Sequence, residues 1–281
     1  MVLAFINNKG GVGKTTSAVN ISAGAANLGK KVLLIDLDSQ RNAGINLGFR
    51  LPPDKFEPSI TDVLLGEETI ENVVKRNLRP NLDLVPNDMR FSSFDVKLGE
   101  LKDPRRSWKL KEALDPIKHL YDLIVLDCGP SFNLSTTNAL LASDYYVVPM
   151  EADFLGMEGI NNLINAVKLI KSNFGKVAEM LGILITKCDV RNNFDKEVIE
   201  ILEAQFSNKV FETKIPINVR IKEASSHGKT LYEYDSSCTG AFFYKKAVEE
   251  VLIKLNLISP NQKLNKNVAY KSLDNRKGAV A

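Results

Sequence analysis

VLAFINNKGGVGKTT, residues 2–16, joins an apolar run to a glycine-rich turn and then to the start of a helical pattern. A strand followed by such a turn and a helix is the context that a phosphate-binding loop requires, because glycines let backbone N–H groups converge on an anion at the helix N-terminus. Lys14 can then reach the β- and γ-phosphates of a nucleotide, and the Thr15 hydroxyl can ligate Mg²⁺. The stretch therefore predicts a nucleotide-binding α/β protein.

The loop departs from the standard pattern at its first position. The motif G-x-x-x-x-G-K-[ST] would place glycine at residue 8, where this chain has Asn8, and an additional lysine follows at Lys9. The backbone that would cradle the phosphates belongs to Gly10, Gly11, Val12 and Gly13. A glycine-rich turn without a ligand is the alternative, and the strand and helix on either side of the turn disfavour it.

Short apolar runs recur along the rest of the chain and predict strands at 2–7, 31–36, 82–86, 121–127, 145–150 and 181–187. Their near-continuous Val, Ile and Leu content is typical of parallel strands that are buried on both faces. Helical patterns alternate with them at about 14–29, 59–65, 106–118, 133–142, 155–173 and 193–206. We predict an α/β fold with a doubly wound, mostly parallel sheet and helices on both faces.

The C-terminal part carries two further signals. Residues 209–216, KVFETKIP, could add a strand, and residues 238–255 have the apolar spacing of an amphipathic helix. The polar or proline-broken stretches 50–58 and 87–105 predict surface loops. We expect the core to close with the last of these helices.

Two aspartates at the end of one predicted strand, and one at the end of another, extend the phosphate site. Asp36 and Asp38 end KVLLIDLD, where the two-residue period of a strand places both carboxylates on one side. Asp127 ends YDLIVLD in the same way. Ligands in such sheets bind at the carboxyl ends of the strands, so the three acids are expected to meet the loop, hold Mg²⁺ through water and orient the attacking water.

Composition narrows the possible chemistry. The chain has 281 residues, 44% of them hydrophobic and 25% charged, which suffices for a sizeable core. Cys128, Cys188 and Cys238 lie far apart, which disfavours disulfides and zinc, and two histidines offer little material for a His-based metal centre or a serine-type triad. The first apolar run is too short for a signal sequence or a membrane span, so we expect a cytoplasmic protein.

The net charge of +3 is located in the last part of the chain. Residues 262–281 carry five basic side chains against one acidic side chain, so the remainder is not basic overall. We predict one P-loop domain over residues 1–258 and a polar, basic, flexible tail over residues 259–281. Any DNA-binding surface must then be a local patch.

With these segments assembled, the chain resembles the ParA/Soj family of deviant Walker-A ATPases, whose relatives include MinD. The resemblance covers nearly the whole chain through VLAFINNKGGVGKTTSAVN, LLIDLDSQRNAG, YDLIVLDCGPSF, VVPMEADFLGMEGI and IPINVRIKEASSHGK. It implies that Lys14, Thr15 and Thr16 hold phosphates and Mg²⁺. It also implies that Asp127 is the Walker B residue and that Asp38 supports hydrolysis by positioning water.

The resemblance further implies a switch driven by ATP and Mg²⁺. Lys9 would reach the nucleotide of a partner subunit, so that ATP is sandwiched in a homodimer, and the loop near Pro216 would cover adenine. Weak ATPase activity would be stimulated by DNA and by a ParB-like adaptor, and the protein would be nucleoid-associated and would segregate or position plasmid or chromosomal DNA.

Four basic residues are candidates for contacting the backbone of double-stranded DNA without reading its sequence. Arg191 and Arg220 match positions where the family places DNA-contacting arginines, and Lys245 and Lys246 extend this basic set. Contacts of this kind give strong salt dependence. Each arginine taken alone could equally be an ordinary exposed or ion-paired side chain.

Two segments depart from the family pattern. The family often has Pro-Gln-Gly after the second aspartate, where this chain has Ser39-Gln40-Arg41, and Pro-Pro-Ser where it has Gly129-Pro130-Ser131. These differences leave the nucleotide site intact and bear on the rate of hydrolysis and on the conformation of the switch.

Other functions remain as alternatives. Thr186-Lys187-Cys188-Asp189 follows a predicted strand, as does the N/T-K-x-D segment with which many GTPases recognise guanine. A MinD-like positioning ATPase would need a C-terminal amphipathic helix, and residues 262–281 show only scattered apolar positions, so we expect no membrane attachment. A nonenzymatic DNA-binding module is disfavoured because no helix-turn-helix segment precedes the loop.

Overall fold

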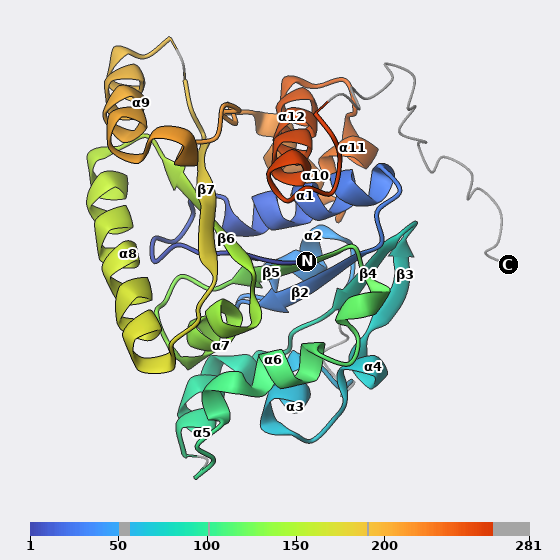
Figure 1. Ribbon diagram of the computed structural model, residues 1–281. Coiled ribbons are helices and arrows are strands. Elements are labelled where there is room, and N and C mark those ends of the chain that lie inside the picture. The colour runs from blue at the N-terminus through green and yellow to red at the C-terminus, as the bar shows by residue number, and fades with distance from the viewer. Residues whose placement is uncertain (51–56, 101, 190, 261–281) are drawn as a thin grey trace, which may run out of the picture.

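The core of the molecule is a seven-stranded sheet with the strand order β3-β4-β2-β5-β1-β6-β7 (Figure 1). A computed structural model describes residues 1–50, 57–100, 102–189 and 191–260. The strands are β1 Val2–Phe5, β2 Val32–Leu37, β3 Lys75–Arg79, β4 Leu82–Val85, β5 Leu123–Cys128, β6 Tyr145–Glu151 and β7 Glu179–Thr186. All neighbouring pairs are parallel except β3 with β4, so the prediction of a mostly parallel sheet is confirmed.

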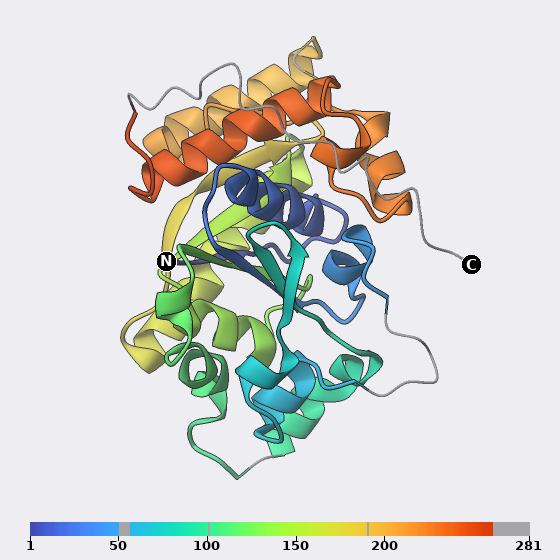
Figure 2. The same ribbon diagram turned by 90° about the vertical axis from the view of Figure 1, so that its right-hand side faces the viewer.

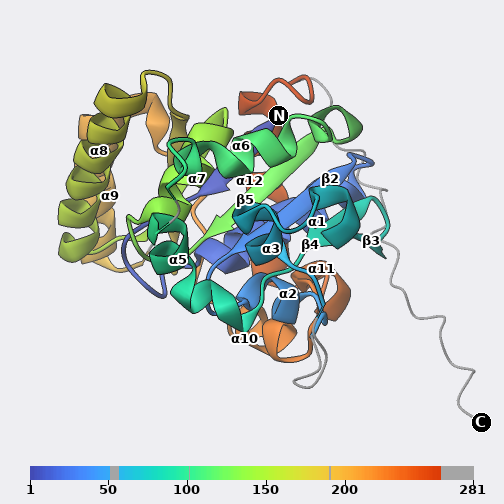
Figure 3. The same ribbon diagram turned by 90° about the horizontal axis from the view of Figure 1, so that it is seen from below.

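Helices cover both faces of this sheet, as the doubly wound prediction requires. On one face lie α1 Lys14–Asn27, α2 Asn42–Asn46, α10 Val219–Ser226, α11 Leu231–Tyr234 and α12 Thr239–Lys254. On the other lie α3 Ile60–Leu65, α4 Ile70–Val73, α5 Phe94–Glu100, α6 Lys109–Leu114, α7 Leu134–Ala142, α8 Phe154–Phe174 and α9 Asn193–Phe206. Figure 3, viewed from below, shows α3, α5, α6 and α7 on the lower side of the sheet.

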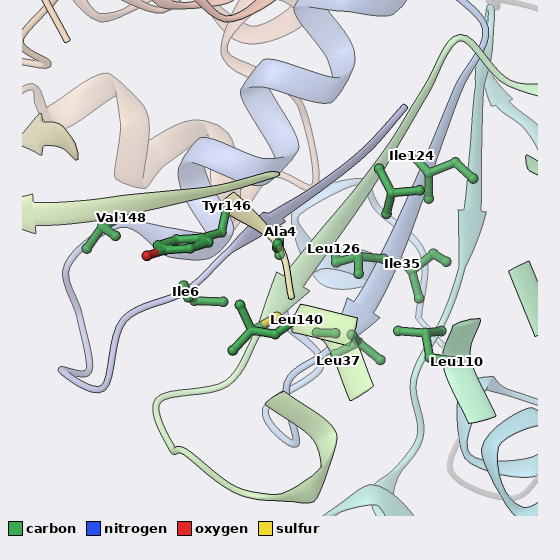
Figure 4. Close-up of a cluster of buried hydrophobic side chains, with 14 of the residues drawn as sticks. Ala4, Ile6, Ile35, Leu37, Leu110, Ile124, Leu126, Leu140, Tyr146 and Val148 are labelled. Carbon is green, nitrogen blue, oxygen red and sulfur yellow. The ribbon is translucent and has the colours of Figure 1, made fainter. Parts of the chain in front are cut away.

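Alternation along the strands explains this two-layer burial. Leu33, Ile35 and Leu37 of β2 face the α6–α7 layer, whereas Val32 and Leu34 face the α1–α12 layer. Each strand residue is buried on its own side, because successive side chains point to opposite faces. Figure 4 shows the first set, where Leu110 of α6 and Leu140 of α7 lie with strand residues including Ile35 and Leu126.

The same alternation places the acids. Asp36 follows Val32 and Leu34 on the α1 side of β2, and Asp127 follows Leu123 and Val125 on the α1 side of β5. Asp36 and Asp127 are also register partners across the two strands. The carboxyl ends of β2 and β5 therefore bring both acids to the face that carries the glycine-rich loop and α1.

Three sequence predictions need correction. The stretch 87–105, expected as a loop, contains the 3-10 helix η1 Met89–Ser93 and α5, and it buries Phe91, Phe94 and Leu98 in the core. The expected strand at 209–216 forms only two isolated bridges, Ile183 with Val210 and Cys188 with Pro216. The helix expected over 106–118 is split into η2 Arg106–Trp108, α6 and η3 Lys118–Leu120.

Other parts of the fold were absent from the predictions. The antiparallel edge strand β3, seen in the side view of Figure 2, was missed, as were the short helices α2, α4, α10 and α11. The 3-10 turn η4 Ser207–Lys209 follows α9. The predicted loop at 50–58 lies partly, and the predicted tail at 259–281 almost entirely, outside the described residues.

Candidate functional site

The glycine-rich loop, residues 8–16, connects β1 to α1 with two residues in the left-handed region. Gly11 has φ 78° and Gly13 has φ 83°, a conformation that glycine adopts without a steric penalty. The carbonyl of Gly13 accepts a hydrogen bond from Ser17 N at 2.9 Å, which starts α1 directly after the loop. The loop therefore ends at the N-terminus of a 14-residue helix, where an anion is favoured.

Neighbouring strands hold the loop in place. Asn7 Nδ2 donates to the Pro149 carbonyl in β6 at 2.8 Å, and Asn7 Oδ1 accepts from Lys9 N at 3.0 Å. Thr186 at the end of β7 donates from its hydroxyl to the Val12 carbonyl at 2.8 Å. Both ends of the loop are thus tied to the carboxyl edge of the sheet.

Lys14 begins α1 and is buried, with 6% of its surface exposed. Its ammonium donates to the carbonyl of Lys9 at 2.9 Å. Burial lowers the pKa of Lys14, and the charges of Asp127 and Asp38 oppose that effect. An anion bound close to this ammonium would replace the stabilisation by water that the charge loses on burial, because a buried charge is costly without a charged partner.

The three acids have different surroundings. Asp36 is fully buried, and its carboxylate accepts backbone N–H groups from Asp38 at 3.0 Å, Ala43 at 3.0 Å and Gly44 at 3.4 Å. Asp36 therefore fixes the turn that leads into α2. Asp38 Oδ1 accepts from Gln40 N at 2.9 Å, and the Asp38 side chain lines the cavity described below.

Asp127 is the exception among buried acids. In the described part of the chain, neither of its carboxylate oxygens has a hydrogen-bond partner, and the residue has no exposed surface. Burial raises the pKa of Asp127 well above its usual range, the neighbouring Asp36 raises it further, and the charge of Lys14 offsets only part of this. Buried acids normally have partners, so this carboxylate is suited to water molecules around a cation.

The three acids do not form a direct ligand cage. Within residues 1–50, 57–100, 102–189 and 191–260, no group of three or more His, Cys, Asp or Glu side chains is arranged to hold a metal ion. A cation here would need oxygen ligands from Thr15, water and phosphate, as Mg²⁺ commonly takes.

A cavity of about 700 Å³ opens at the loop, and we call it the loop cavity. One end is lined by Gly10, Gly11, Gly13, Lys14, Thr15, Thr16 and Asp38. The other end is largely apolar and is lined by Ile215, Pro216, Ile217, Ile221 and Tyr244. A polar end at a helix N-terminus and an apolar slot suit a ligand with phosphates and a planar base. The expected position of Pro216 agrees with this geometry.

The segment Thr186-Lys187-Cys188-Asp189 meets the loop cavity only in part. Thr186 and Lys187 line the cavity. Asp189, which would have to recognise guanine, is instead held by Arg191, whose Nε and terminal nitrogen lie 3.0 and 2.9 Å from its carboxylate oxygens. The geometry does not favour the guanine alternative.

The candidate DNA-binding residues come from adjoining segments, and we call them together the basic surface. Cys188 and Pro216 form a parallel bridge, and Arg191 and Arg220 follow them within a few residues. Arg220 Nη1 lies 2.7 Å from Glu223, and its Nε lies 3.6 Å from Asp235. Next to Asp235, the Ser236 carbonyl accepts from Lys245 Nζ at 3.4 Å.

Lys246 differs from the other members of the basic surface. It is exposed, and its ammonium lies 4.7 Å from the centre of the Phe242 ring. Both arginines of this set already have acidic partners. DNA phosphates would have to compete with those carboxylates.

Sequence reasoning missed one partner of the loop. Lys9 Nζ forms an ion pair with Asp153 Oδ2 at 2.6 Å, and about one third of each side chain is exposed. Asp153 also caps α8, since its other oxygen accepts from Gly156 N at 2.5 Å. The position directly before a predicted helix is the usual signal of such a capping aspartate.

The fold and the loop define the class of protein, a P-loop ATPase-type α/β protein, and comparisons with known proteins agree. A family described as an AAA domain matches residues 1–180. The chain is 38% identical over 250 residues to the sporulation initiation inhibitor protein Soj of Bacillus subtilis, and the aligned region covers 89% of this chain and 97% of that protein. It is 36% identical over 253 residues to the chromosome partitioning protein ParA of Caulobacter vibrioides, covering 89% and 93%. The chain therefore belongs to the ParA/Soj family of partition ATPases.

Solved structures give the same fold. The cobyrinic acid a,c-diamide synthase of Mycobacterium smegmatis, solved with an ATP analogue and magnesium, superimposes with a TM-score of 0.77 at 26% identity. The match covers 91% of this chain and 95% of that one. Separately, none of the helices within the described residues has the length and apolar character to span a membrane.

Proposed function

We propose that this protein is an ATP-driven switch that segregates or positions plasmid or chromosomal DNA. The observation that carries the proposal is the loop cavity, which the buried Lys14 lines at the start of α1, together with the buried Asp127 carboxylate at the end of β5, which has no hydrogen-bond partner among the described residues. Family membership and the structural relative solved with an ATP analogue and magnesium support ATP and Mg²⁺ as the ligands.

Each part of the loop has a task in this proposal. The backbone of Gly10, Gly11, Val12 and Gly13 accommodates the phosphates, while Lys14 binds the β- and γ-phosphates. Thr15 would ligate Mg²⁺, Thr16 would support the phosphate contacts, and Asp127 would hold water ligands of the metal. Bound Mg²⁺ would neutralise part of the phosphate charge. Pro216 and its apolar neighbours cover the base, and Asp38 positions the attacking water.

Lys9 separates this switch from an ordinary P-loop enzyme. Its ammonium faces Asp153 in the single chain and would turn to the triphosphate held by a second copy in a face-to-face dimer. Desolvation between two subunits strengthens such a contact because the effective dielectric constant falls. ATP then becomes part of the dimer interface.

The dimer would bind double-stranded DNA through the basic surface, with Arg191, Arg220, Lys245 and Lys246 contacting phosphates rather than bases. A ParB-like adaptor would stimulate the weak ATPase and release the dimer, and nucleoid association follows from nonspecific DNA binding.

Equilibrium titration with ATP and GTP, combined with DNA co-sedimentation, tests the proposal. We expect ATP to bind more tightly than GTP. We also expect DNA binding to require the ATP-bound state, which a nonhydrolysable ATP analogue maintains during the assay. The matched control is the same assay with ADP. Equal affinity for GTP, or DNA binding that is the same with ADP, would contradict the proposal. Co-sedimentation with liposomes in place of DNA would instead support a MinD-like role.

A further inference from the structure

The segment from Asp36 to Asn42 forms a wall between two cavities. Asp38, Gln40 and Asn42 line the loop cavity on one side. Asp36 and Arg41 line a second cavity of about 270 Å³ on the other side. The remaining lining residues of the second cavity are Gly44, Ile45, Phe49, Arg50, Pro86 and Asn87.

Hydrogen bonds fix this wall. Asp38 N donates to Asp36 Oδ1 at 3.0 Å, and Arg41 N donates to the Asp38 carbonyl at 2.9 Å. Asn87, which lines the second cavity, donates from Nδ2 to the same Asp38 carbonyl at 3.0 Å. A ligand in the second cavity would therefore touch groups that hold the backbone of Asp38.

Arg41 brings a charge to the second cavity that forms no ion pair with any described residue. Its Nε is buried without a hydrogen-bond partner, and no described residue forms an ion pair with its guanidinium. A buried donor of a charged group without a partner is costly. Arg90 shows the usual arrangement, because ion pairs with Asp62 and Asp88 compensate its charge.

Asp36, the one acid in the described lining of the second cavity, forms no ion pair with Arg41 and uses its oxygens elsewhere. Both oxygens of Asp36 accept backbone N–H groups, from Asp38 on one side and from Ala43 and Gly44 on the other. A second cation, Arg50, is exposed at this cavity, and no ion pair with it occurs among the described residues. Among the described residues, the lining therefore presents two guanidinium groups and one carboxylate, whose oxygens already accept backbone N–H groups.

The backbone conformation of Arg41 is also unfavourable for an arginine. Arg41 has φ 56°, in the left-handed region that glycine adopts freely and that other residues adopt at a steric cost. Arginine is thus unfavourable at this position for two reasons, the positive φ of its backbone and the burial of its Nε without a partner. Its charge forms no ion pair with a described residue, and Arg41 does not line the loop cavity.

We propose that the second cavity binds the anionic group of a small molecule, a phosphate or a carboxylate, through Arg41 with Arg50 as a second cation. The planar guanidinium donates two parallel hydrogen bonds to either group. A volume of about 270 Å³ lies just below the roughly 300–1,000 Å³ of pockets for drug-sized ligands, so the ligand is small. Because the wall includes Asp38, this site would regulate the proposed ATPase, and in that respect it rests on the proposed function.

Amide NMR during titration with inorganic phosphate, and separately with acetate at constant ionic strength, tests the proposal. Excess Mg²⁺ and a nonhydrolysable ATP analogue keep the loop cavity filled. We expect at least one anion to give saturable shifts at Gly44 and Asn87, and the anion that does so identifies the chemical class. Arg41→Gly should weaken this binding at least tenfold, and it should fold well because φ 56° suits glycine.

Arg105→Ala is the matched control, because Arg105 is exposed and paired with Glu112 away from both cavities. It should leave anion binding unchanged. The proposal is overturned if neither anion gives saturable shifts, if Arg41→Gly binds as wild type does, or if Arg105→Ala loses binding equally.

A second pair of measurements separates this inference from the proposed function. Lys14→Ala should lose ATP while the second cavity still binds the anion, and Arg41→Gly should do the reverse. Loss of anion binding with ATP affinity intact in Arg41→Gly supports the second site. A wild-type protein that binds ATP but neither anion defeats this inference alone, and one that binds an anion through Arg41 but not ATP defeats the proposed function alone.

Discussion

Two charged groups beside the glycine-rich loop, Lys14 and Asp127, are buried and form no ion pair with a described residue, whereas the arginines of the basic surface are exposed and already paired. The Lys14 ammonium donates to a backbone carbonyl, and the Asp127 carboxylate has no hydrogen-bond partner among the described residues. Arg191 is held by Asp189, and Arg220 is held by Glu223. The two regions thus differ in what a ligand would find on arrival.

This difference predicts two kinds of binding. A nucleotide and its metal would supply the missing partners in the loop cavity, so each contact there should contribute strongly. DNA would exchange one set of exposed ion pairs for another on the basic surface, and such pairs are weak and sensitive to salt. Loss of the buried Lys14 should therefore abolish tight ATP binding, and changes at the basic surface should only weaken DNA binding.

The largest effect is expected at Lys14. Lys14→Ala removes charge-assisted hydrogen bonds to two phosphates, each of roughly 1.5–3 kcal/mol, so ATP affinity should fall by about 1,000-fold. Nucleotide titration measures the loss. Lys187→Ala is the control, because Lys187 also lines the cavity but is exposed and paired with Glu151 at 2.8 Å. Equal losses in both variants would break the distinction between buried and paired lysines.

The next effect concerns dimerisation. Lys9→Ala would remove one desolvated contact to each of the two nucleotides in a dimer, so ATP-dependent dimerisation should weaken by roughly several hundred-fold. The ATP affinity of the monomer should stay within about threefold of wild type. Sedimentation with a nonhydrolysable ATP analogue measures the first quantity and nucleotide titration the second. Wild-type dimerisation by the variant would exclude the sandwich dimer.

Asp38 tests the chemical step rather than binding. Asp38→Ala should slow hydrolysis by roughly 100-fold, because an acid that positions water acts in the transition state, while ATP binding and dimerisation remain. The variant should stay on DNA for longer than wild type. Steady-state phosphate release and DNA dissociation measure the two effects. An unchanged turnover rate would remove Asp38 from the proposed mechanism.

How far the sequence predicts these regions differs between them. The sequence predicted the faces of β2 and β5 because successive residues of a strand point to opposite sides of the sheet. It predicted the glycine-rich loop because a phosphate-binding turn needs glycine at fixed positions. The family resemblance supplied the arginine positions. It could not show that Asp189 and Glu223 hold them, because ion pairs across a turn depend on rotamers that no spacing fixes.

The errors in the fold have local causes. The stretch 87–105 looks polar, yet Phe91 and Phe94 stack at 4.8 Å and fill the core between α3 and α6. The edge strand β3, KRNLR, carries charges typical of an exposed edge, and its apolar content is too low to suggest a strand. Short elements of this kind are set by tertiary contacts rather than by pattern.

The basic surface should respond by degrees. Arg191→Glu combined with Arg220→Glu should weaken DNA binding at least tenfold and reduce the log–log salt slope by about two, while ATP binding is retained. Arg105→Glu with Lys118→Glu is the control, since both residues are exposed and paired with acids elsewhere and the net charge changes equally. DNA binding measured at several salt concentrations decides the matter. Equal slopes in the two double variants would mean that net charge, rather than this surface, binds DNA.

The smallest effect is expected where the two regions meet, at the ion pair between Lys9 and Asp153. Lys9 belongs to the glycine-rich loop but, like the arginines of the basic surface, it is ion-paired. Its ammonium lies 2.6 Å from Asp153, and about one third of each side chain is exposed. Before it can reach a partner's triphosphate, it must leave Asp153. Asp153→Asn removes the competing charge and keeps an oxygen for the Gly156 N–H that caps α8, so the helix should be retained. We expect ATP-dependent dimerisation to tighten by roughly threefold, because a partly exposed ion pair is worth little.

Glu151→Gln is the matched control, since Glu151 lies nearby but pairs with Lys187, and it should dimerise as wild type does. Sedimentation at increasing concentrations of the ATP analogue resolves a shift of this size. Unchanged or weaker dimerisation of Asp153→Asn would mean that the pair helps to build the interface, and Lys9 would then act together with Asp153 rather than in competition with it.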